Sequence, residues 1–567
     1  MRYPRLGVLT LIFFLGLSAK AQDTPNPLRV STTNPRYFTD NSGKAIFLTG
    51  SNWGGELQDD SWSISYTFNF DNSAPGNISY LDFLAGENHN YIRAYMVEHS
   101  RWNPVDSSIM NVLAHPMPYF RDPASPPAND GQPRFTVDRA DGSQFSSDYF
   151  SRLLQRTSKA GQPTPSRPTP IYLGVMLFEG FSITNTVPDC NNNPVWDSWF
   201  AHPYNSGNNI NGVNGDPRGT GQGLGLLTYG DPEFATINRL QDAYVQHFVE
   251  TVNGLDNVIY DIINEPPRCP SGQLDAWERH IVQVIRNAEK NTLRQHPILR
   301  GTYVLQAPSN ECVNGDNRYL FVNAGDGTDA NAISPWPGDP DTEDYAGDGS
   351  GPKRSDGTRV IVSDTDHLWG GNVAQGSDQP VNLVWKSLTR GMGGLVFLDP
   401  DLVPLSDIPP LSCLNDCACK GGPIKEDSAS AYAPIRKAMG DALVFSRIID
   451  LIHMTPENER CAGTGYCLAQ TLGDQTGKQF LAFAPTVPSD STINLTLIGA
   501  FAGDTFDLTW FNPLTGDIAS GGTVSPTVND GTVSPAVPTG WRNAVACLAK
   551  SGSTLRCPTR NDLPPRR

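Results

Sequence analysis

A carboxylate stands at the end of an apolar run in VIYDIINEPP, residues 258–267. The run is typical of a buried strand, and Pro266 and Pro267 prevent the strand from continuing because proline lacks an amide N–H. Glu265 therefore lies where a strand ends, and a carboxylate there can donate and accept a proton. Asn264 beside it can hydrogen-bond a substrate hydroxyl group. The pattern predicts general acid–base chemistry at the mouth of a barrel.

Two further carboxylates accompany another apolar run, RVIVSDTDHLWGG, residues 359–371. Asp364 stands where the run ends, and Asp366 and His367 follow it closely. Two acids on different strand ends can divide one reaction, with one moving the proton and the other attacking carbon or activating water. We favour Asp364 over Asp366 by its place, and His367 is a candidate to orient that carboxylate or bind substrate. The alternative is that both acids are structural acceptors for loop amides.

Apolar runs of this kind recur along most of the chain. They are rich in β-branched and aromatic residues and mostly continuous rather than alternating, as parallel strands buried on both faces should be. Seven of them predict strands at residues 45–50, 90–97, 171–179, 258–264, 302–307, 359–364 and 394–399. An eighth strand, between about 315 and 335, is poorly marked.

Helical patterns alternate with these strands. Apolar residues recur every four positions from Leu240 to Val252, and Asn253-Gly254 ends that helix. A second amphipathic pattern covers residues 274–288. Repeated strand–helix units predict an α/β fold, a (β/α)₈ TIM barrel, in which the loops after the strands build the active site.

The pattern changes near residue 455, where short alternating strands separated by turn residues begin. They predict a small β-sandwich. The expected domains are a signal peptide at 1–21, the barrel with an N-terminal strand pair at 22–454, the β-sandwich at 455–550 and a tail at 551–567.

The first residues predict export. Arg2 and Arg5 precede an apolar stretch over residues 6–17, and a small-residue site follows that ends in Ala21. This is the pattern of a signal peptide cleaved near Ala21. The alternative, a membrane anchor, is weaker because the apolar core is too short to span a bilayer. The sequence therefore predicts a secreted protein, periplasmic or extracellular.

Charge and composition narrow the classes of partner. The formal net charge is −17, which disfavours nucleic acid and anionic membrane surfaces and suits neutral ligands. The 53 glycines and 47 prolines favour long ordered loops over a helical bundle. No nucleotide-binding glycine pattern and no convincing metal-ligand pattern occurs in the sequence, so we expect no cofactor and no metal. The oligomeric state stays open.

The ten cysteines all follow the predicted signal peptide. An even number in an oxidising compartment favours disulfides. Spacing does not decide the connectivity, but the candidate pairs are Cys461 with Cys467, Cys547 with Cys557, and Cys269 with Cys312. A metal site in the cluster at 413–419 is the alternative, which we disfavour because no histidine accompanies it.

A strand that ends in Asn264, Glu265 and Pro266 and precedes a helix is similar to the acid/base motif of clan A glycoside hydrolases, retaining enzymes built on (β/α)₈ barrels. Residues 28–55 look like the N-terminal strand pair and first barrel strand of apiosidase-like glycoside hydrolases. Residues 506–518 look like the small β-sandwich that follows those barrels, a domain of the so-called collagen-binding type. In such enzymes this domain more often packs against the barrel than binds collagen.

The resemblance implies a secreted glycoside hydrolase that retains anomeric configuration by double displacement. Glu265 would be the acid/base, and the nucleophile would come from the seventh strand, where Asp364 or Asp366 stands instead of the usual Glu. The long loops favour exo-action on plant or microbial polysaccharides or oligosaccharides, but the sugar stays open. The alternatives are an inverting hydrolase, a transglycosylase, or an inactive carbohydrate-binding or adhesin protein.

Two charged residues at predicted strand ends are candidates to support this chemistry. Arg93 resembles the arginine that holds the clan A nucleophile ionised, and a buried pair with Glu98 is the alternative. Glu179 ends the third predicted strand and could bind substrate hydroxyl groups or form that ion pair.

Loop residues complete the candidate substrate contacts. His202 and Asn209 lie in an Asn-rich loop whose amides could bind sugar hydroxyl groups, although turn formation is the alternative. Trp53 and Trp369 are expected near the strand ends, where an indole can stack on a sugar ring or serve as core.

Overall fold

Eight parallel strands close into a barrel. The computed structural model of the protein describes residues 26–52, 56–58, 70, 79–101, 113–183, 197–264, 266, 273–304, 330–334, 354–365, 378–398, 429–460, 465–487 and 491–563. In chain order the barrel strands are β4 (Leu48–Asn52), β5 (Tyr91–Ala94), β8 (Tyr172–Glu179), β9 (Val258–Asn264), β10 (Ile298–Val304), β11 (Ala330–Ser334), β12 (Val360–Thr365) and β13 (Gly394–Leu398). Because β13 pairs with β4, the sheet has no free edge.

The structure confirms the predicted barrel, locates its poorly marked strand and moves the start of another strand. The poorly marked strand is β11, a five-residue element that pairs in parallel with both β10 and β12. Strand β10 begins at Ile298, four residues before the predicted start at 302, because Ile298 and Leu299 already pair with β9. All eight strands point the same way, so their carboxyl ends share one rim.

Helices separate most of the barrel strands. They are α1 (Tyr80–Gly86), α2 (Ser147–Gly161), α3 (Ala235–Val252), α4 (Gln273–Glu289), α5 (Gln379–Thr389) and α6 (Ala429–Ile448). Ser146 caps the start of α2 by accepting a hydrogen bond from the backbone N–H of Tyr149. Among the described residues, no helix has the length and apolar character needed to cross a membrane.

The inside of the barrel is closed by side chains at its amino-terminal end. Tyr91, Tyr172, Ile259 and Leu299 belong to one buried cluster there, together with residues of β4, β12 and β13. Tyr91 needs a glycine on the neighbouring strand, because a Cβ at Gly174 would lie 2.1 Å from the Tyr91 hydroxyl oxygen. The barrel is therefore a packed core and not a pore.

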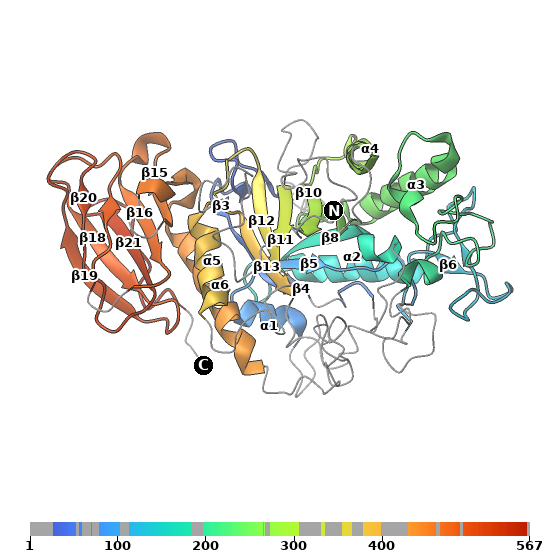
Figure 1. Ribbon diagram of the computed structural model, residues 1–567, viewed down its shortest axis with the longest axis horizontal. Coiled ribbons are helices and arrows are strands. Elements are labelled where there is room, and N and C mark those ends of the chain that lie inside the picture. Colours follow the sequence, from blue (N-terminus) through green and yellow to red (C-terminus); the bar gives the residue numbers. More distant parts are fainter. Residues whose placement is uncertain are drawn as a thin grey trace, which may run out of the picture.

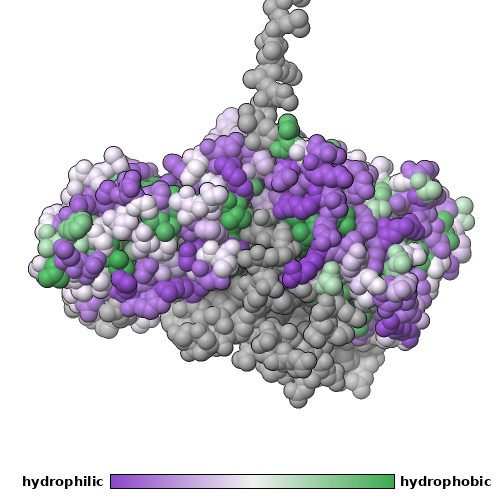
Figure 2. Space-filling view, turned by 90° about the horizontal axis from the view of Figure 1, so that it is seen from above, coloured by the Kyte–Doolittle hydropathy of each residue, from purple (hydrophilic) through white to green (hydrophobic). Residues whose placement is uncertain are grey.

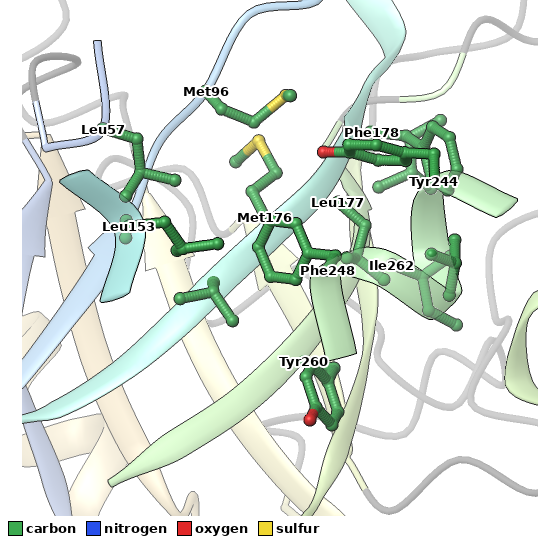
Figure 3. Packing of buried hydrophobic residues seen from close by; sticks show 14 of the residues in the cluster. Leu57, Met96, Leu153, Met176, Leu177, Phe178, Tyr244, Phe248, Tyr260 and Ile262 are labelled. Carbon is green, nitrogen blue, oxygen red and sulfur yellow. The ribbon is translucent and has the colours of Figure 1, made fainter. Parts of the chain in front are cut away.

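A larger core joins the outside of the barrel to its helices. Met176 and Phe178 of β8 pack against residues of the surrounding helices, including Leu153 of α2 and Tyr244 and Phe248 of α3 (Figure 3). On α3 the buried apolar residues recur at helical spacing, which explains why this face of the helix packs against the barrel.

Three small sheets lie outside the barrel and the main C-terminal sheet. Strands β1 (Arg29–Val30), β2 (Phe38–Thr39) and β3 (Ala45–Ile46) form an antiparallel sheet directly before the barrel. Strands β6 (Phe120–Arg121) and β7 (Phe135–Thr136) form a hairpin in the long loop after β5. Strands β17 (Leu495–Thr496) and β20 (Thr532–Val533) form a two-stranded sheet in the C-terminal domain.

The C-terminal domain is built on a six-stranded antiparallel sheet with the order β14-β15-β16-β21-β18-β19. Its strands are β14 (Met454–Pro456), β15 (Cys467–Gln470), β16 (Gln479–Ala484), β18 (Phe506–Phe511), β19 (Ile518–Val524) and β21 (Ala544–Lys550). The expected alternation between buried and exposed residues is absent from β16 and β21, which are buried on both faces. In β16, Phe480 and Ala482 enter the core under the β17–β20 sheet, while Leu481 and Phe483 enter a core shared with α5 and α6.

This shared core joins the C-terminal domain to the barrel. The Trp385 ring of α5 lies 5.1 Å from the Phe445 ring of α6 and 5.3 Å from the Phe511 ring of β18. Figure 1 shows the domain, coloured orange to red, directly beside α5 and α6. The expectation that this domain packs against the barrel is confirmed.

One of the predicted disulfides lies within the described chain. Cys547 and Cys557 are bonded and tie β21 to the segment that follows it. Cys467 is also disulfide-bonded, and Cys461, its predicted partner, lies outside the described residues.

The described surface is mixed, with hydrophilic residues over most of it and hydrophobic residues in small spots (Figure 2).

Replacing Trp385 with alanine should destabilise the whole molecule. The side chain is fully buried between the two domains, and truncating a buried aromatic residue costs about 3–5 kcal/mol. Calorimetry should show a lower melting temperature for both domains. Phe501→Ala is the control, because Phe501 is 65% exposed and its loss should change stability by less than about 0.5 kcal/mol. Equal melting curves for the two variants would contradict a shared core.

Candidate active site

A buried ion pair lies inside the barrel near its carboxyl rim. Nε of Arg93, on β5, donates to Oδ2 of Asp261, on β9, at 2.6 Å, and both side chains are almost fully buried. Burying a single charge in a barrel is costly, so the two charges depend on each other. The sequence alternative that paired Arg93 with Glu98 is corrected, because the pairing carboxylate on the described chain is Asp261.

Arg93 also holds the residue that precedes Glu265. Its Nη1 donates to Oδ1 of Asn264 at 2.7 Å. On its other side, Nδ2 of Asn264 lies 3.3 Å and 3.4 Å from the two carboxylate oxygens of Glu179, on β8. The Asn264 amide is thus clamped between a cation and an anion, which decides which way its oxygen and nitrogen face.

Glu179 is connected in turn to the loop after β5. Its backbone N–H donates to Oε2 of Glu98 at 3.0 Å. The backbone N–H of Glu98 donates to Oγ of Ser182 at 2.9 Å, in the short helix η1 (Gly180–Ile183) that follows β8. Three neighbouring strands, β5, β8 and β9, are therefore tied together at their carboxyl ends by side chains.

A neutral histidine completes this network. Nδ1 of His99 lies 2.8 Å from Oγ of Ser182, which can donate its proton because it already accepts the Glu98 N–H. Burial, and to a smaller extent the nearby His202, lowers the pKa of His99 to about 3. His99 is therefore uncharged at neutral pH, and its Nδ1 shares a hydrogen bond with the Ser182 hydroxyl group.

His202 reaches the same place from the long loop after β8. Its Nδ1 accepts the backbone N–H of Tyr204 at 3.0 Å, so the ring presents Nε2 to Glu98, whose Oε1 lies 3.6 Å away. The ring is buried against Trp199, with 5.1 Å between ring centroids. The structure thus brings His202 and Glu179 together around Glu98. Both His202 and Glu179 are buried.

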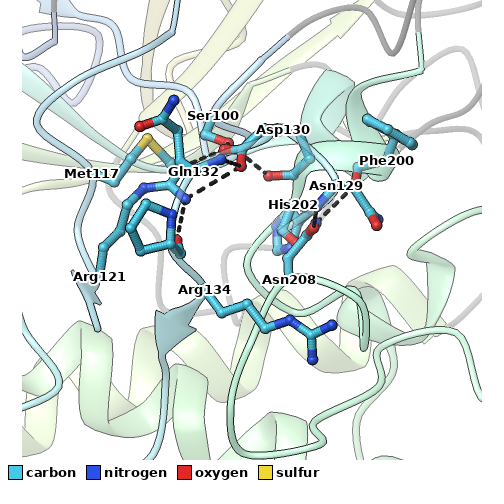
Figure 4. Close-up of polar contacts among 12 residues, drawn as sticks. Ser100, Met117, Arg121, Asn129, Asp130, Gln132, Arg134, Phe200, His202 and Asn208 are labelled. Atoms are coloured by element: carbon cyan, nitrogen blue, oxygen red, sulfur yellow. Dashed lines mark hydrogen bonds and ion pairs between the residues drawn. The ribbon is translucent and has the colours of Figure 1, made fainter. Parts of the chain in front are cut away.

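The long loops after β5 and β8 are joined to each other by hydrogen bonds (Figure 4). Asp130, in the loop after β5, accepts from Nη2 of Arg121 at 2.5 Å and from the backbone N–H of Gln132 at 3.0 Å. Asn208, in the loop after β8, accepts the backbone N–H of Asn129 at 2.9 Å and donates to the carbonyl of His202 at 2.9 Å.

Asn209 serves the loop rather than an open binding surface. Its amide nitrogen donates to the carbonyls of Pro203, Asn205 and Val213, and its amide oxygen accepts the Val213 N–H. The side chain is only 1% exposed, so its polar atoms are used within the loop. This arrangement corresponds to the turn-forming alternative raised for the Asn-rich segment.

Several predicted site residues lie outside the described residues. They are Glu265, Asp366, His367, Trp53 and Trp369. The backbone of Asp364 is described, and it is the second-last residue of β12, where it pairs with Val396 of β13. Asp364 and Asn264 therefore stand at the same rim of the barrel, on its seventh and fourth strands.

Sequence reasoning missed three polar residues of this network: Asp261, Ser182 and His99. Asp261 is a charged residue inside an otherwise apolar strand, a signal for a buried partner that could have been used. Ser182 and His99 follow strand ends but match no spacing rule. No group of three or more histidine, cysteine or acidic side chains suited to a metal occurs in the described part of the chain.

The fold, unlike the sequence, has recognisable relatives. Comparison with protein-family models gives no match, and comparison with curated proteins gives none. Among solved structures, one described as a glycoside hydrolase is similar at a TM-score of 0.53 and 12% identity, covering 93% of this chain and 97% of that one. A glycoside hydrolase family 5 structure from Bacteroides vulgatus ATCC 8482 is similar at a TM-score of 0.53 and 12% identity, covering 93% and 94%. At this low identity, the structural match shows a shared fold and nothing more. Because it covers 93% of this chain, the similarity includes the C-terminal domain.

The free energy of unfolding should fall as the pH is lowered from about 6.5 toward 3. Below 6.5, the ordinary pKa of histidine, the unfolded chain binds a proton at His99 that the folded chain refuses until about pH 3. This costs up to about 1.4 kcal/mol per pH unit. His99→Gln should reduce the slope, as measured by urea unfolding at a series of pH values.

His89 provides a matched case outside the network. Burial lowers its pKa to about 4, and its Nε2 lies 3.1 Å from the carbonyl oxygen of Arg436. The double variant His89→Gln/His99→Gln should lose more of the pH slope than either single variant. A slope that neither substitution changes would show that these rings are not the groups that titrate.

Removing the cation of the buried ion pair should be strongly destabilising. Arg93→Met leaves the carboxylate of Asp261 inside the barrel without its guanidinium partner, at a cost of about 3–5 kcal/mol. The double variant Arg93→Met/Asp261→Leu removes both charges and should recover much of this loss in denaturant unfolding. A double variant less stable than Arg93→Met would argue against a mutual dependence of the two charges.

Proposed function

We propose that this protein is a secreted glycoside hydrolase that cleaves glycosidic bonds of plant or microbial polysaccharides or oligosaccharides. The observation that carries the proposal is the placement of two acid-bearing segments on one closed barrel. The fourth strand, β9, ends at Asn264, which Glu265 follows directly in the chain, and the seventh strand, β12, carries Asp364 at the same rim. Acids at the carboxyl ends of barrel strands are where barrel enzymes hold their catalytic groups.

The clamp on Asn264 supports a positioned acid at the next residue. Consecutive Cα atoms lie about 3.8 Å apart, so holding Asn264 between Arg93 and Glu179 restricts where Glu265 can lie. An acid/base group must hold its place within a fraction of an ångström to transfer a proton efficiently. Arg93, Asn264 and Glu179 are thus positioning residues in this proposal.

The reaction follows a double displacement. Glu265 donates its proton to the glycosidic oxygen while the Asp364 carboxylate attacks the anomeric carbon, which breaks the bond to the leaving group and forms a glycosyl–enzyme ester. Glu265, now ionised, takes a proton from water, whose oxygen attacks the same carbon and releases Asp364 as a carboxylate. Configuration is retained because the carbon is inverted twice.

The separation between the two carboxylates decides the stereochemistry. Retention needs about 5 Å, whereas about 6.5–9.5 Å leaves room for water and gives inversion. Asp366 is the competing nucleophile or base in the second case. Export after cleavage near Ala21, exo-action and a place beside apiosidase-like enzymes remain parts of the proposal that rest on the sequence.

Hydrolysis of a panel of aryl pyranosides, aryl furanosides and polysaccharides tests the proposal. We expect Glu265→Ala and Asp364→Ala to lower kcat by about 10²–10⁴-fold, with Asp366→Ala retaining most of the activity. Azide should restore turnover in Asp364→Ala, because it replaces the missing nucleophile and yields a glycosyl azide. Rescue of Asp366→Ala instead would move the nucleophile to that residue.

Asp356→Ala is the matched control, since it removes an exposed carboxylate that precedes the same strand at the opposite end of the barrel. It should keep wild-type activity. A wild-type protein that binds saccharides but cleaves nothing on the panel would favour an inactive carbohydrate-binding or adhesin protein. Full activity in Glu265→Ala would remove the acid/base assignment.

A further inference from the structure

An open recess of about 560 Å³ lies at the amino-terminal end of the barrel, opposite the candidate active site. Its lining comes from the segments that lead into barrel strands: Ile46 and Phe47 before β4, Pro170 and Tyr172 at the start of β8, and Leu255 before β9. Parts of α2 and α6 complete the wall. Because strands β4, β8 and β9 run from this end toward the rim, the recess is separated from Asn264 by the length of the barrel.

The hydroxyl of Tyr172 faces this recess without a partner among the described residues. The residue is only 8% exposed, and its hydroxyl makes no hydrogen bond to any described residue. Burial, and the nearby carboxylate of Asp40, raise the pKa of Tyr172 well above its ordinary value, so the hydroxyl keeps its proton. Because no described residue engages it, this hydroxyl is available to a ligand in the recess.

Charged groups of both signs stand around that hydroxyl. Arg447, on α6, lines the recess and has no acidic partner within the described part of the chain. Arg294 is already paired with Asp256 at 2.7 Å. Asp40 uses Oδ1 to accept the Ser42 N–H at 2.8 Å, and its Oδ2 accepts no hydrogen bond from the described residues.

These groups match the chemistry of a neutral sugar. Arg447 and Tyr172 can donate to hydroxyl oxygens, and Asp40 can accept from a hydroxyl group. The partly exposed apolar side chains of Ile46 and Leu255 offer surface to the C–H face of a ring. The recess is lined by two carboxylates, of Asp40 and Asp256, and by two guanidinium groups, of Arg294 and Arg447, so its formal charges balance and suit a neutral ligand. Its volume falls in the range of about 300–1,000 Å³ that small-molecule sites occupy.

We propose that the recess formed by Tyr172, Arg447 and Asp40 is a second, non-catalytic binding site for a neutral saccharide. The choice of saccharide rests on the proposed function, while the existence of the site rests on the recess itself. With one site at each end of the barrel, the protein would hold a polysaccharide at a place remote from cleavage.

Titration calorimetry with cello-, xylo- and manno-oligosaccharides tests this site in a Glu265→Gln background, where hydrolysis is blocked. Tyr172→Phe removes only the hydroxyl and should weaken one class of sites about fivefold, and Arg447→Met should weaken it about tenfold. Tyr229→Phe and Arg239→Met are matched controls, because both residues are exposed and lie outside the recess. They should bind like the background.

A steric variant keeps the test independent of those two side chains. A Cβ at Gly254, which lines the recess, would meet no atom within 4 Å, so Gly254→Trp can fill the recess with little backbone strain. It should abolish one class of sites. Binding that none of the three substitutions alters would overturn the proposal.

The two proposals fail separately. If the wild-type protein hydrolyses glycosides but no oligosaccharide binding depends on Tyr172, Arg447 or Gly254, the second site is refuted and the enzyme stands. If no glycoside is hydrolysed but the recess variants lose binding, the second site stands and the enzyme is refuted.

Discussion

The Arg93 guanidinium is buried inside the barrel, and the arrangement of the candidate site depends on how its charge is satisfied. Asp261 provides the countercharge at 2.6 Å and Asn264 the second acceptor at 2.7 Å. Both acceptors lie on β9, so one arginine from β5 determines how that strand ends. Glu179 on β8 completes the arrangement by accepting from the Asn264 amide. Because the charge of Arg93 cannot be hydrated inside the barrel, its hydrogen bonds to Asp261 and Asn264 are needed to stabilise it, and they fix the position of the Asn264 side chain.

The C-terminal domain belongs to the same packed body as the barrel. Its central strands β16 and β21 are buried on both faces, by the β17–β20 sheet on one side and by α5 and α6 on the other. These two helices follow the seventh and eighth barrel strands, so the domain braces the part of the barrel that carries Asp364. The core that the domain shares with α5 and α6 gives it a structural role in supporting the barrel.

The two ends of the barrel differ in how their polar groups are used. At the carboxyl rim, Arg93, Asn264, Glu179, Glu98 and His202 lie along one connected line of contacts between neighbouring strands and loops. At the amino-terminal end, Tyr172, Arg447 and Asp40 retain groups that no described residue engages. Connected groups hold a geometry, whereas unengaged groups in a recess are free to meet a ligand. This contrast agrees with the two proposals, which put catalysis at the rim that carries the acids and saccharide binding at the opposite end.

The sequence by itself determined the class of fold and the places where acids leave the strands. Continuous apolar runs ended by proline or polar residues are local signals, and they located seven barrel strands and the residues around Glu265 and Asp364. The weak strand β11 could be recognised only from its pairing with β10 and β12, because its sequence, ANAIS, has one β-branched residue and no continuous apolar run. Likewise, only the tertiary structure decided that Arg93 pairs with Asp261, that Asn209 serves its own loop, and that the central strands of the C-terminal sheet are buried on both faces. The first and the last depend on contacts between residues far apart in the chain, and the second depends on how one loop closes on itself. Local spacing along the sequence indicates neither kind of contact.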